Sequence, residues 1–161
     1  MRKNSGFTLF ELLAVIGIVA VLSAIAIPNF FSWLPKYRLG SAARNLLSAM
    51  QYARLVAVKK NVDILVNLDS VENKYIVFPD YNSSDSQDSD EPTLKRGKMP
   101  GGVSIKKTDF DDDTLIFNSR GLLTGKGIIG GTVSIANNAN DLKEIRINRT
   151  GNSRILAIGE P

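Results

Sequence analysis

The most constraining feature of this sequence is an apolar run from residue 7 to residue 35 in which Glu11 is the only charged side chain. An α-helix rises about 1.5 Å per residue, so residues 7–27 would form a helix of about 32 Å. That length is close to the ~30 Å hydrocarbon core of a bilayer. We therefore expect residues 7–27 to form an apolar helix that crosses a membrane.

The apolar pattern changes after Pro35. Apolar residues then recur every three or four positions as far as about Lys60, with polar residues between them, which predicts an amphipathic helix. Joined to the apolar segment, this would be one helix of about 53 residues and about 80 Å. We expect Pro28 and Pro35 to bend it, because a proline lacks the N–H and crowds the carbonyl four residues earlier.

From residue 61 onward, apolar residues alternate with polar ones, which is the period of a β-strand. Turn-forming residues separate seven short runs: Val62–Leu68, Tyr75–Phe78, Val103–Lys106, Thr114–Phe117, Thr132–Ala136, Glu144–Asn148 and Arg154–Ile158. The pair Asp69-Ser70 indicates a hairpin between the first two runs. The acidic, serine-rich segment Asp80–Pro92 is typical of a solvated, mobile loop.

Together these patterns predict an α+β fold. A long N-terminal α-helix, with a membrane-spanning first half and an amphipathic second half, would pack on a small, mostly antiparallel β domain formed by residues 61–161.

The composition excludes several classes of enzyme and metal site. The chain has no histidine and no cysteine, which rules out a Ser-His-Asp triad, a thiol nucleophile, disulfides and the usual zinc sites. The sequence defines no pair of acidic residues at a catalytic spacing. The net charge of +4 permits an acidic partner without requiring one. We expect no enzymatic activity and no cofactor.

The short basic segment Met1–Gly6 before the apolar run has three interpretations. The first is a secretory signal peptide, since Ala24-Ile25-Ala26 provides a small-residue cleavage pattern. The second is a single membrane anchor, whose orientation the basic residues on both sides leave open. In either case the β domain would be a secreted or anchored module with an unrelated binding or enzymatic role.

The third interpretation rests on the motif Gly6-Phe7-Thr8-Leu9-Phe10-Glu11. This motif resembles the processing site of type IV pilins and type II secretion pseudopilins. The resemblance implies a leader peptide of residues 1–6, cleavage by a prepilin peptidase between Gly6 and Phe7, and N-methylation of Phe7. It also implies an assembly role for Pro28, which stands where members of this family often carry a helix-bending proline.

The chemistry of Glu11 supports the same interpretation. A carboxylate in a membrane helix costs about 2.5–3.5 kcal/mol near the bilayer centre and less near the surface, so it should have a partner. After cleavage, the α-amine of Phe7 would be a cation one helical turn away, on the same or a neighbouring chain. A carboxylate–ammonium pair between adjacent helices would neutralise both charges and fix the axial stagger between subunits.

Three further segments are similar to the GspH/FimT subgroup of minor pseudopilins and minor pilins: Met50–Leu68, Phe117–Gly121 and Ile145–Ile155. The resemblance implies a pilin-like fold and a structural subunit of a type II secretion pseudopilus. Its partners would be other pseudopilins, contacted through the helix of residues 7–60, and an inner-membrane assembly platform. The chain would cross the inner membrane once, with residues 61–161 in the periplasm. A minor pilin of a type IV pilus is the alternative within the family.

Some members of this subgroup resemble DNA-uptake proteins that bind phosphate with a Gly-Arg-x-Arg turn. The matching positions here are Gly151-Asn152-Ser153-Arg154, so only Arg154 carries over. Arg146 and Arg149 are close in sequence and would complete a candidate nucleic-acid contact. We favour the simpler interpretation, a hairpin with polar outward positions whose isoleucines face the core.

Asp109, Asp111 and Asp113 stand at alternate positions, as the first ligands of a calcium loop do. The EF-hand loop needs Gly at its sixth position and Glu at its twelfth, where this sequence has Thr114 and Arg120. An EF-hand is excluded at these residues. We expect no metal site, and these three acids are the only candidates for a looser one.

Overall fold

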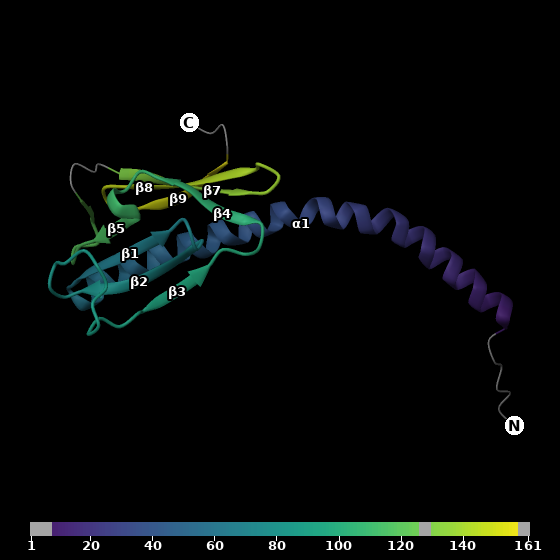
Figure 1. The fold of residues 1–161 in the computed structure, drawn as a ribbon, viewed down its shortest axis with the longest axis horizontal. Helices are drawn as coiled ribbons and strands as arrows, with labels where there is room; N and C mark the ends of the chain where they lie inside the picture. Colours follow the sequence, from purple (N-terminus) through teal and green to yellow (C-terminus); the bar gives the residue numbers. More distant parts are fainter. Residues whose placement is uncertain (1–7, 126–129, 158–161) are drawn as a thin grey trace, which may run out of the picture. The chain divides into compact units, whose positions relative to one another are not determined.

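The computed structural model describes residues 8–125 and 130–157. Two compact units, residues 1–34 and 35–161, make up the chain. The helix α1 (Leu9–Lys60) contributes to both units (Figure 1).

Helix α1 confirms the predicted continuous helix and its end at Lys60. It is unbroken at Pro28 and at Pro35, and the bend at each proline stays a prediction. After Lys60, Asn61 adopts a left-handed φ of 53°, and the N–H of Val62 donates to the carbonyl of Ala57 at 3.3 Å. This bond satisfies a carbonyl that the helix end would leave unpaired, and it turns the chain into the first strand.

Two antiparallel sheets follow the helix, with strand orders β3-β2-β1-β5-β6 and β4-β7-β8-β9 (Figure 1). Every strand pair in the described residues is antiparallel. The strands are β1 (Asp63–Asp69), β2 (Lys74–Asp80), β3 (Lys95–Lys98), β4 (Val103–Thr108), β5 (Thr114–Phe117), β6 (Leu123–Thr124), β7 (Gly130–Asn137), β8 (Leu142–Asn148) and β9 (Ser153–Ala157).

All seven predicted runs form strands, with ends within two residues of those expected. Ile158, the last residue of the seventh run, lies outside the described residues. The sequence did not indicate β3 or β6. Strand β3, with the sequence Lys-Arg-Gly-Lys, has no apolar alternation because it lies at the edge of the first sheet, where charged residues prevent pairing with other chains. Strand β6 has only two residues.

The core of residues 35–161 forms between one face of α1 and both sheets. The buried helix residues are Leu39, Ala42, Ala43, Leu46, Ala49, Met50, Ala53, Val56 and Ala57. Their spacing of three and four places them on one side of the helix. The same cluster contains Val66 of the first sheet and Ile145 of the second, both without solvent exposure. The amphipathic second half of the predicted helix and its packing on an antiparallel β domain are thus confirmed.

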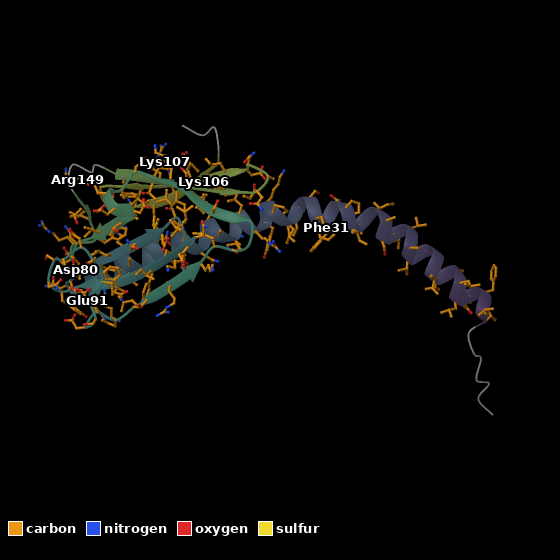
Figure 2. The ribbon with its side chains drawn as sticks, in the orientation of Figure 1. Phe31, Asp80, Glu91, Lys106, Lys107 and Arg149 are labelled. Atoms are coloured by element: carbon orange, nitrogen blue, oxygen red, sulfur yellow. The ribbon has the colours of Figure 1, made fainter. Side chains whose placement is uncertain are left out.

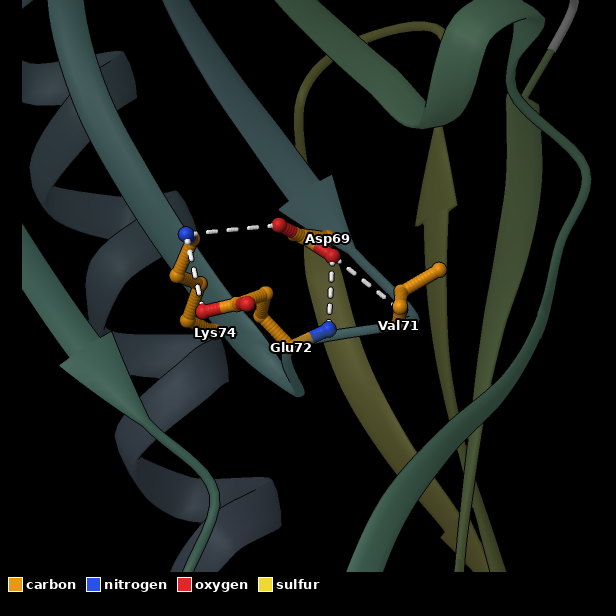
Figure 3. A network of polar contacts seen from close by, with 4 residues as sticks. All are labelled: Asp69, Val71, Glu72 and Lys74. Atoms are coloured by element: carbon orange, nitrogen blue, oxygen red, sulfur yellow. Dashed lines mark hydrogen bonds and ion pairs between the residues drawn. The ribbon is translucent and has the colours of Figure 1, made fainter.

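One carboxylate holds the turn between β1 and β2 (Figure 3). Asp69 accepts hydrogen bonds from the N–H groups of Val71 at 3.0 Å and Glu72 at 2.8 Å, and Lys74 Nζ lies 3.5 Å from its second oxygen. The bond from the Glu72 N–H is the main cause that lowers the pKa of Asp69, and Lys74 lowers it further. The hydrogen bond and charge of Glu72 raise the pKa of Lys74. The hairpin predicted at Asp69-Ser70 is confirmed.

Asn73, the last residue of this turn, joins the hairpin to the second sheet. Its φ is 52°, and its side-chain Oδ1 accepts the N–H of Ile105 at 2.9 Å. Its carbonyl accepts the N–H of Met99 at 2.8 Å. The pairing of β4 with β7 shifts register between Ile105 and Lys107, which marks a β-bulge. At this bulge the N–H of Ile105 donates to the Asn73 side chain.

The segment Asp80–Pro92 is exposed in its middle, as predicted, whereas Asp80 and Glu91 near its two ends are buried. Asp80 is 6 % exposed and Glu91 is 4 % exposed. Both carboxylates accept hydrogen bonds from backbone N–H groups inside the segment. The expectation of a fully solvated loop is therefore wrong at these two acids, because the backbone folds around them.

Candidate functional site

The predicted processing site, Gly6 and Phe7, lies outside the described residues. The first described residue, Thr8, accepts a hydrogen bond at its Oγ1 from the N–H of Glu11 at 3.2 Å. This is the N-cap bond of a capping box, in which a Thr is followed three residues later by a Glu. The Glu11 carboxylate lies in the first turn, where it complements the helix dipole. Thr8 and Glu11 thus fix the start of α1.

The first half of α1 exposes apolar side chains around its whole circumference. None of residues 9–34 is buried, and Ile18 and Leu22 are each 61 % exposed. Residues 9–27, the described part of the predicted span, are about 28 Å long as a helix. By length and composition, α1 is the one helix among the described residues that could cross a membrane. A surface this apolar needs lipid or other helices to cover it.

Aromatic side chains gather just after the predicted span. The rings of Phe30 and Phe31 contact edge to face, with centroids 6.1 Å apart and planes at 75°, and Figure 2 labels Phe31 on the helix. Trp33 is 54 % exposed. Pro28 precedes this group on a part of the helix where no side chain is buried. Aromatic residues of this kind collect where a membrane helix leaves the hydrocarbon.

The β8–β9 hairpin brings two of the three predicted basic residues side by side. Arg146 and Arg154 lie directly opposite in the register, and both are exposed. Arg149 is exposed in the turn between the strands. None of the three forms an ion pair within the described residues. Ile145 and Ile147 have no solvent exposure, so the predicted inward face of the hairpin is confirmed. The nucleic-acid contact stays a prediction.

The three acids considered for calcium do not share one site. Asp109 forms an ion pair with Lys107 at 3.3 Å, and Asp113 accepts a hydrogen bond from a threonine hydroxyl. Asp111 is exposed at the start of the short 3-10 helix η1 (Asp111–Asp113). In the part of the chain that the structure describes, no three acidic side chains are grouped so that they could hold a metal ion.

One guanidinium connects three segments that are distant in sequence. Arg54 on α1 donates from Nε to the carbonyl of Gly121 at 3.0 Å and from Nη1 to Asn152 Oδ1 at 2.9 Å. Gly151 has a φ of 76°, and a Cβ there would lie 2.4 Å from the Gly121 carbonyl oxygen. Arg54, Gly121 and Asn152 belong to the three segments whose sequences are similar to the GspH/FimT subgroup. The structure shows that these three segments meet at Arg54.

Two family models match the chain. The model of type II transport protein GspH matches residues 42–151, and the model of the prokaryotic N-terminal methylation motif matches residues 1–27. The first match includes Arg54 and Gly121, and the second includes Glu11.

Curated relatives include a fimbrial protein and a prepilin peptidase-dependent protein. A fimbrial protein of Pseudomonas aeruginosa is 26 % identical over 152 residues, which cover 93 % of this chain and 90 % of the relative. Prepilin peptidase-dependent protein D of Escherichia coli is 58 % identical over 36 residues, which cover 22 % of this chain and 25 % of the relative.

Solved structures of two minor subunits share the fold. The minor pseudopilin EpsH from the type 2 secretion system of Vibrio cholerae has a TM-score of 0.56 and 16 % identity, covering 76 % of this chain and 99 % of that one. The type IV minor pilin FimU of Pseudomonas aeruginosa has a TM-score of 0.57 and 22 % identity, covering 78 % of this chain and 90 % of that one. The fold is therefore pilin-like.

Proposed function

Because this chain belongs to the GspH family of type II transport proteins, we propose that it is a minor pseudopilin, a structural subunit of a type II secretion pseudopilus. The N-terminal methylation motif supports processing by a prepilin peptidase between Gly6 and Phe7, followed by N-methylation of Phe7. The peptidase and an inner-membrane assembly platform perform the chemistry, and this chain is their substrate and building block.

The exposed apolar half of α1 is the observation that carries this proposal. Residues 9–34 bury no side chain within the chain, and their surface is apolar on all sides. Before assembly, the inner membrane would cover this surface, with residues 61–161 in the periplasm. After assembly, the helices of neighbouring pseudopilins would cover it.

Glu11 would set the position of each subunit along the assembly. It is the one charged side chain on the apolar half, and its carboxylate is exposed in the first turn. Pairing with the α-amine of Phe7 on a neighbouring subunit would remove the cost of about 2.5–3.5 kcal/mol for an unpaired carboxylate at depth in a membrane. Pro28, by bending the helix, would adjust how the helices pack.

The mass of the mature chain tests the processing step. We expect a chain that begins at N-methylated Phe7. A chain that begins at Ile27 would indicate a secreted domain, and a chain that keeps Met1 would indicate an ordinary membrane anchor. Either result would contradict the proposal.

Glu11→Ala tests the assembly step. We expect cleavage and methylation to continue and incorporation into the pseudopilus to fall at least about tenfold, because an unpaired amine would remain in the apolar core. The measurement is the amount of the chain in purified filaments relative to the membrane fraction. Glu72→Ala removes an exposed acid from the β domain and serves as the control, with unchanged incorporation. Normal incorporation of Glu11→Ala would contradict the assigned role of Glu11.

A minor pilin of a type IV pilus is the second candidate. The fimbrial relative that covers 93 % of this chain and the likeness to FimU support it. The sibling pilin-like proteins that co-purify with this chain distinguish the two systems, since pseudopilins would indicate secretion and pilins would indicate a pilus.

A further inference from the structure

The unit of residues 35–161 contains a small pocket at the point where the chain leaves the apolar half of α1. We call it the Arg38 pocket. Its volume is about 110 Å³, and it is lined by Pro35 and Arg38 of α1, Gly101, Gly102 and Val103 at the start of β4, and Asn138 after β7. Three segments that are distant in sequence therefore converge on one pocket, and all of them belong to the same compact unit.

Hydrogen bonds between the lining residues hold the pocket together. Arg38 Nη1 donates to the carbonyl of Gly101 at 3.2 Å. The N–H of Asn138 donates to the carbonyl of Gly102 at 3.0 Å, which ties the loop before β4 to the loop after β7. Gly102 has a φ of 84°, a conformation that favours glycine. These contacts fix the backbone of the pocket and one nitrogen of the guanidinium.

The side chains in the pocket keep hydrogen-bond donors that the chain does not use. A guanidinium has five N–H donors, and Arg38 makes one hydrogen bond within the described residues. The Asn138 side chain makes none there, and its Nδ2 lies 3.5 Å from the place that a Cβ on Gly102 would take. No acid of the described residues lines the pocket. Donors without a carboxylate suit an anion, and the planar guanidinium matches the geometry of a phosphate.

The charge of the surrounding helix favours the same ligand. After Glu11, α1 has no further acidic residue, whereas Lys36, Arg38 and Arg44 follow one another within three turns and are exposed. None of these three forms an ion pair within the part of the chain that the structure describes. Their positive charge is therefore left to attract an anion from outside the chain.

The position of Arg38 in the chain indicates which phosphate the pocket would meet. Aromatic residues such as Trp33 lie at the level of the lipid headgroups. Arg38 follows Trp33 by five residues, which is about 8 Å along the helix. Side chains of a helix point back toward its N-terminus, and a long arginine carries its charge to the membrane surface. The guanidinium would thus reach the phosphates of the leaflet from which residues 35–161 emerge.

We propose that the Arg38 pocket binds the phosphate of an anionic phospholipid in this leaflet. The guanidinium of Arg38 and the side-chain amide of Asn138 donate to the phosphate oxygens, and Lys36 adds positive charge at the membrane surface. The inference rests on the membrane anchoring of residues 9–34 in the proposed function, and it goes further by assigning a lipid class and a site on the chain.

Fluorescence quenching by brominated lipids tests the proposal in the full chain, reconstituted in phosphatidylcholine nanodiscs. The one tryptophan is moved to position 31 by Trp33→Phe with Phe31→Trp, because residue 31 precedes Arg38 by seven residues, or two helical turns. A minor share of the lipid is replaced by brominated phosphatidylglycerol or by brominated phosphatidylcholine, whose phosphate is accompanied by a cation. We expect this reporter chain to prefer phosphatidylglycerol about fivefold, the ratio that one basic residue supplies at an anionic surface.

Two variants of the reporter chain test the pocket itself. Arg38→Gln should lower the preference at least about threefold, because it removes the charge and the guanidinium. Asn138→Ala should lower it about twofold or more, because it removes a donor to the phosphate and leaves the net charge unchanged.

Arg120→Gln is the matched control. It removes the same charge as Arg38→Gln from an exposed residue, and the neighbouring Gly121 contacts Arg54, about 24 Å further along α1 than Arg38. The control should keep the preference of the reporter chain. Inorganic phosphate, added at constant ionic strength, should also leave the preference unchanged, because the lipid is held at the site by its membrane.

Each result decides the proposal. A preference for phosphatidylglycerol that Arg38→Gln and Asn138→Ala lower and Arg120→Gln keeps would confirm it. Equal quenching by the two lipids would overturn it and leave membrane anchoring intact, whereas no quenching by either lipid would contradict the anchoring and the proposed function as well. Equal losses in Arg38→Gln and Arg120→Gln, or no loss in Asn138→Ala, would replace the pocket by general charge attraction. Loss of the preference in inorganic phosphate would assign the pocket to free phosphate instead of a lipid.

Discussion

The two halves of α1 have the same secondary structure and opposite surroundings. Residues 9–34 bury no side chain, although their apolar content is the higher of the two. In the second half, one face contributes nine residues to the core and the other face remains exposed. Five of these nine are alanines, which allow the sheets to approach the helix closely.

The difference shows that hydrophobicity and burial are separate properties of a helix. The second half is held by its own domain, because its apolar residues lie on one side and meet both sheets. The first half has apolar residues on every side, so no single domain could cover it. Its N-cap at Thr8 defines where it starts, and its surface is left for a membrane or for other subunits.

Leu46→Ala and Leu22→Ala compare the two halves most directly. Leu46 has no solvent exposure, so its truncation should leave a cavity and lower the free energy of unfolding by about 2–5 kcal/mol. Leu22 is 61 % exposed, and its truncation should change that free energy by less than about 0.5 kcal/mol. Urea titration of the full chain in micelles, followed by the circular dichroism of the β domain, measures both. Equal losses of unfolding free energy in the two variants would contradict this difference between the two halves of α1.

Gly151→Ala and Gly17→Ala extend the comparison to close backbone contacts. A Cβ at Gly151 would lie 2.4 Å from the Gly121 carbonyl oxygen at a φ of 76°, and one at Gly17 would meet nothing within 4 Å. We expect Gly151→Ala to cost about 1–3 kcal/mol or more, since the conformation is strained and the contact with Arg54 must open. Gly17→Ala should leave the unfolding of the β domain unchanged. The same urea titration provides the test, and a neutral Gly151→Ala would contradict the close contact.

The smallest effect of the three should come from acid, which should act on the turn that Asp69 holds in the β domain. The pKa of Asp69 is below its ordinary value, so its contribution to stability is complete above the ordinary carboxyl pKa of about 4 and is lost as the pH falls through the lower folded value. Asp69→Asn should flatten the stability of the β domain between about pH 4 and the folded pKa. Thermal unfolding at several pH values measures this. An unchanged pH profile would show that the Asp69 turn does not contribute.

Lys74, in the same turn, should give stability the opposite dependence on pH. Its pKa is raised by Glu72 and then by Asp69, so its contribution is complete below the ordinary lysine pKa and is lost as the pH rises through the higher folded value. The side chain of Lys74 is 46 % exposed, and solvent screens the pair. The loss above about pH 10 should therefore be small.

Local patterns were enough to predict most of the elements. The spacing of apolar residues predicted α1 to its last residue, because a helix of that length repeats one pattern many times. The alternation of apolar residues predicted seven strands, because each of them packs one face on the core. Strand β3 carries no such alternation, because an edge strand of charged residues is defined by its pairing with β2 rather than by burial.

The functional residues also divide into those that a local pattern identified and those that only the fold revealed. Glu11 could be identified from its neighbours in the chain, since a single acid in an apolar run is visible without a structure. The segment Asp80–Pro92, in contrast, was predicted to be a solvated loop throughout. Its high content of serine and aspartate resembled a disordered composition, and the burial of its two end acids appeared only in the fold.

The sequence by itself determined the two kinds of helix surface, the end of α1, and the family to which the chain belongs. These are properties of neighbouring residues, which are repeated or concentrated along the chain. Only the tertiary structure decided that Arg54 meets Gly121 and Asn152, which are 67 and 98 residues away, and that Asp80 and Glu91 are buried although the loop between them is exposed. Such contacts depend on how the sheets pack on the helix, and no local pattern records that packing.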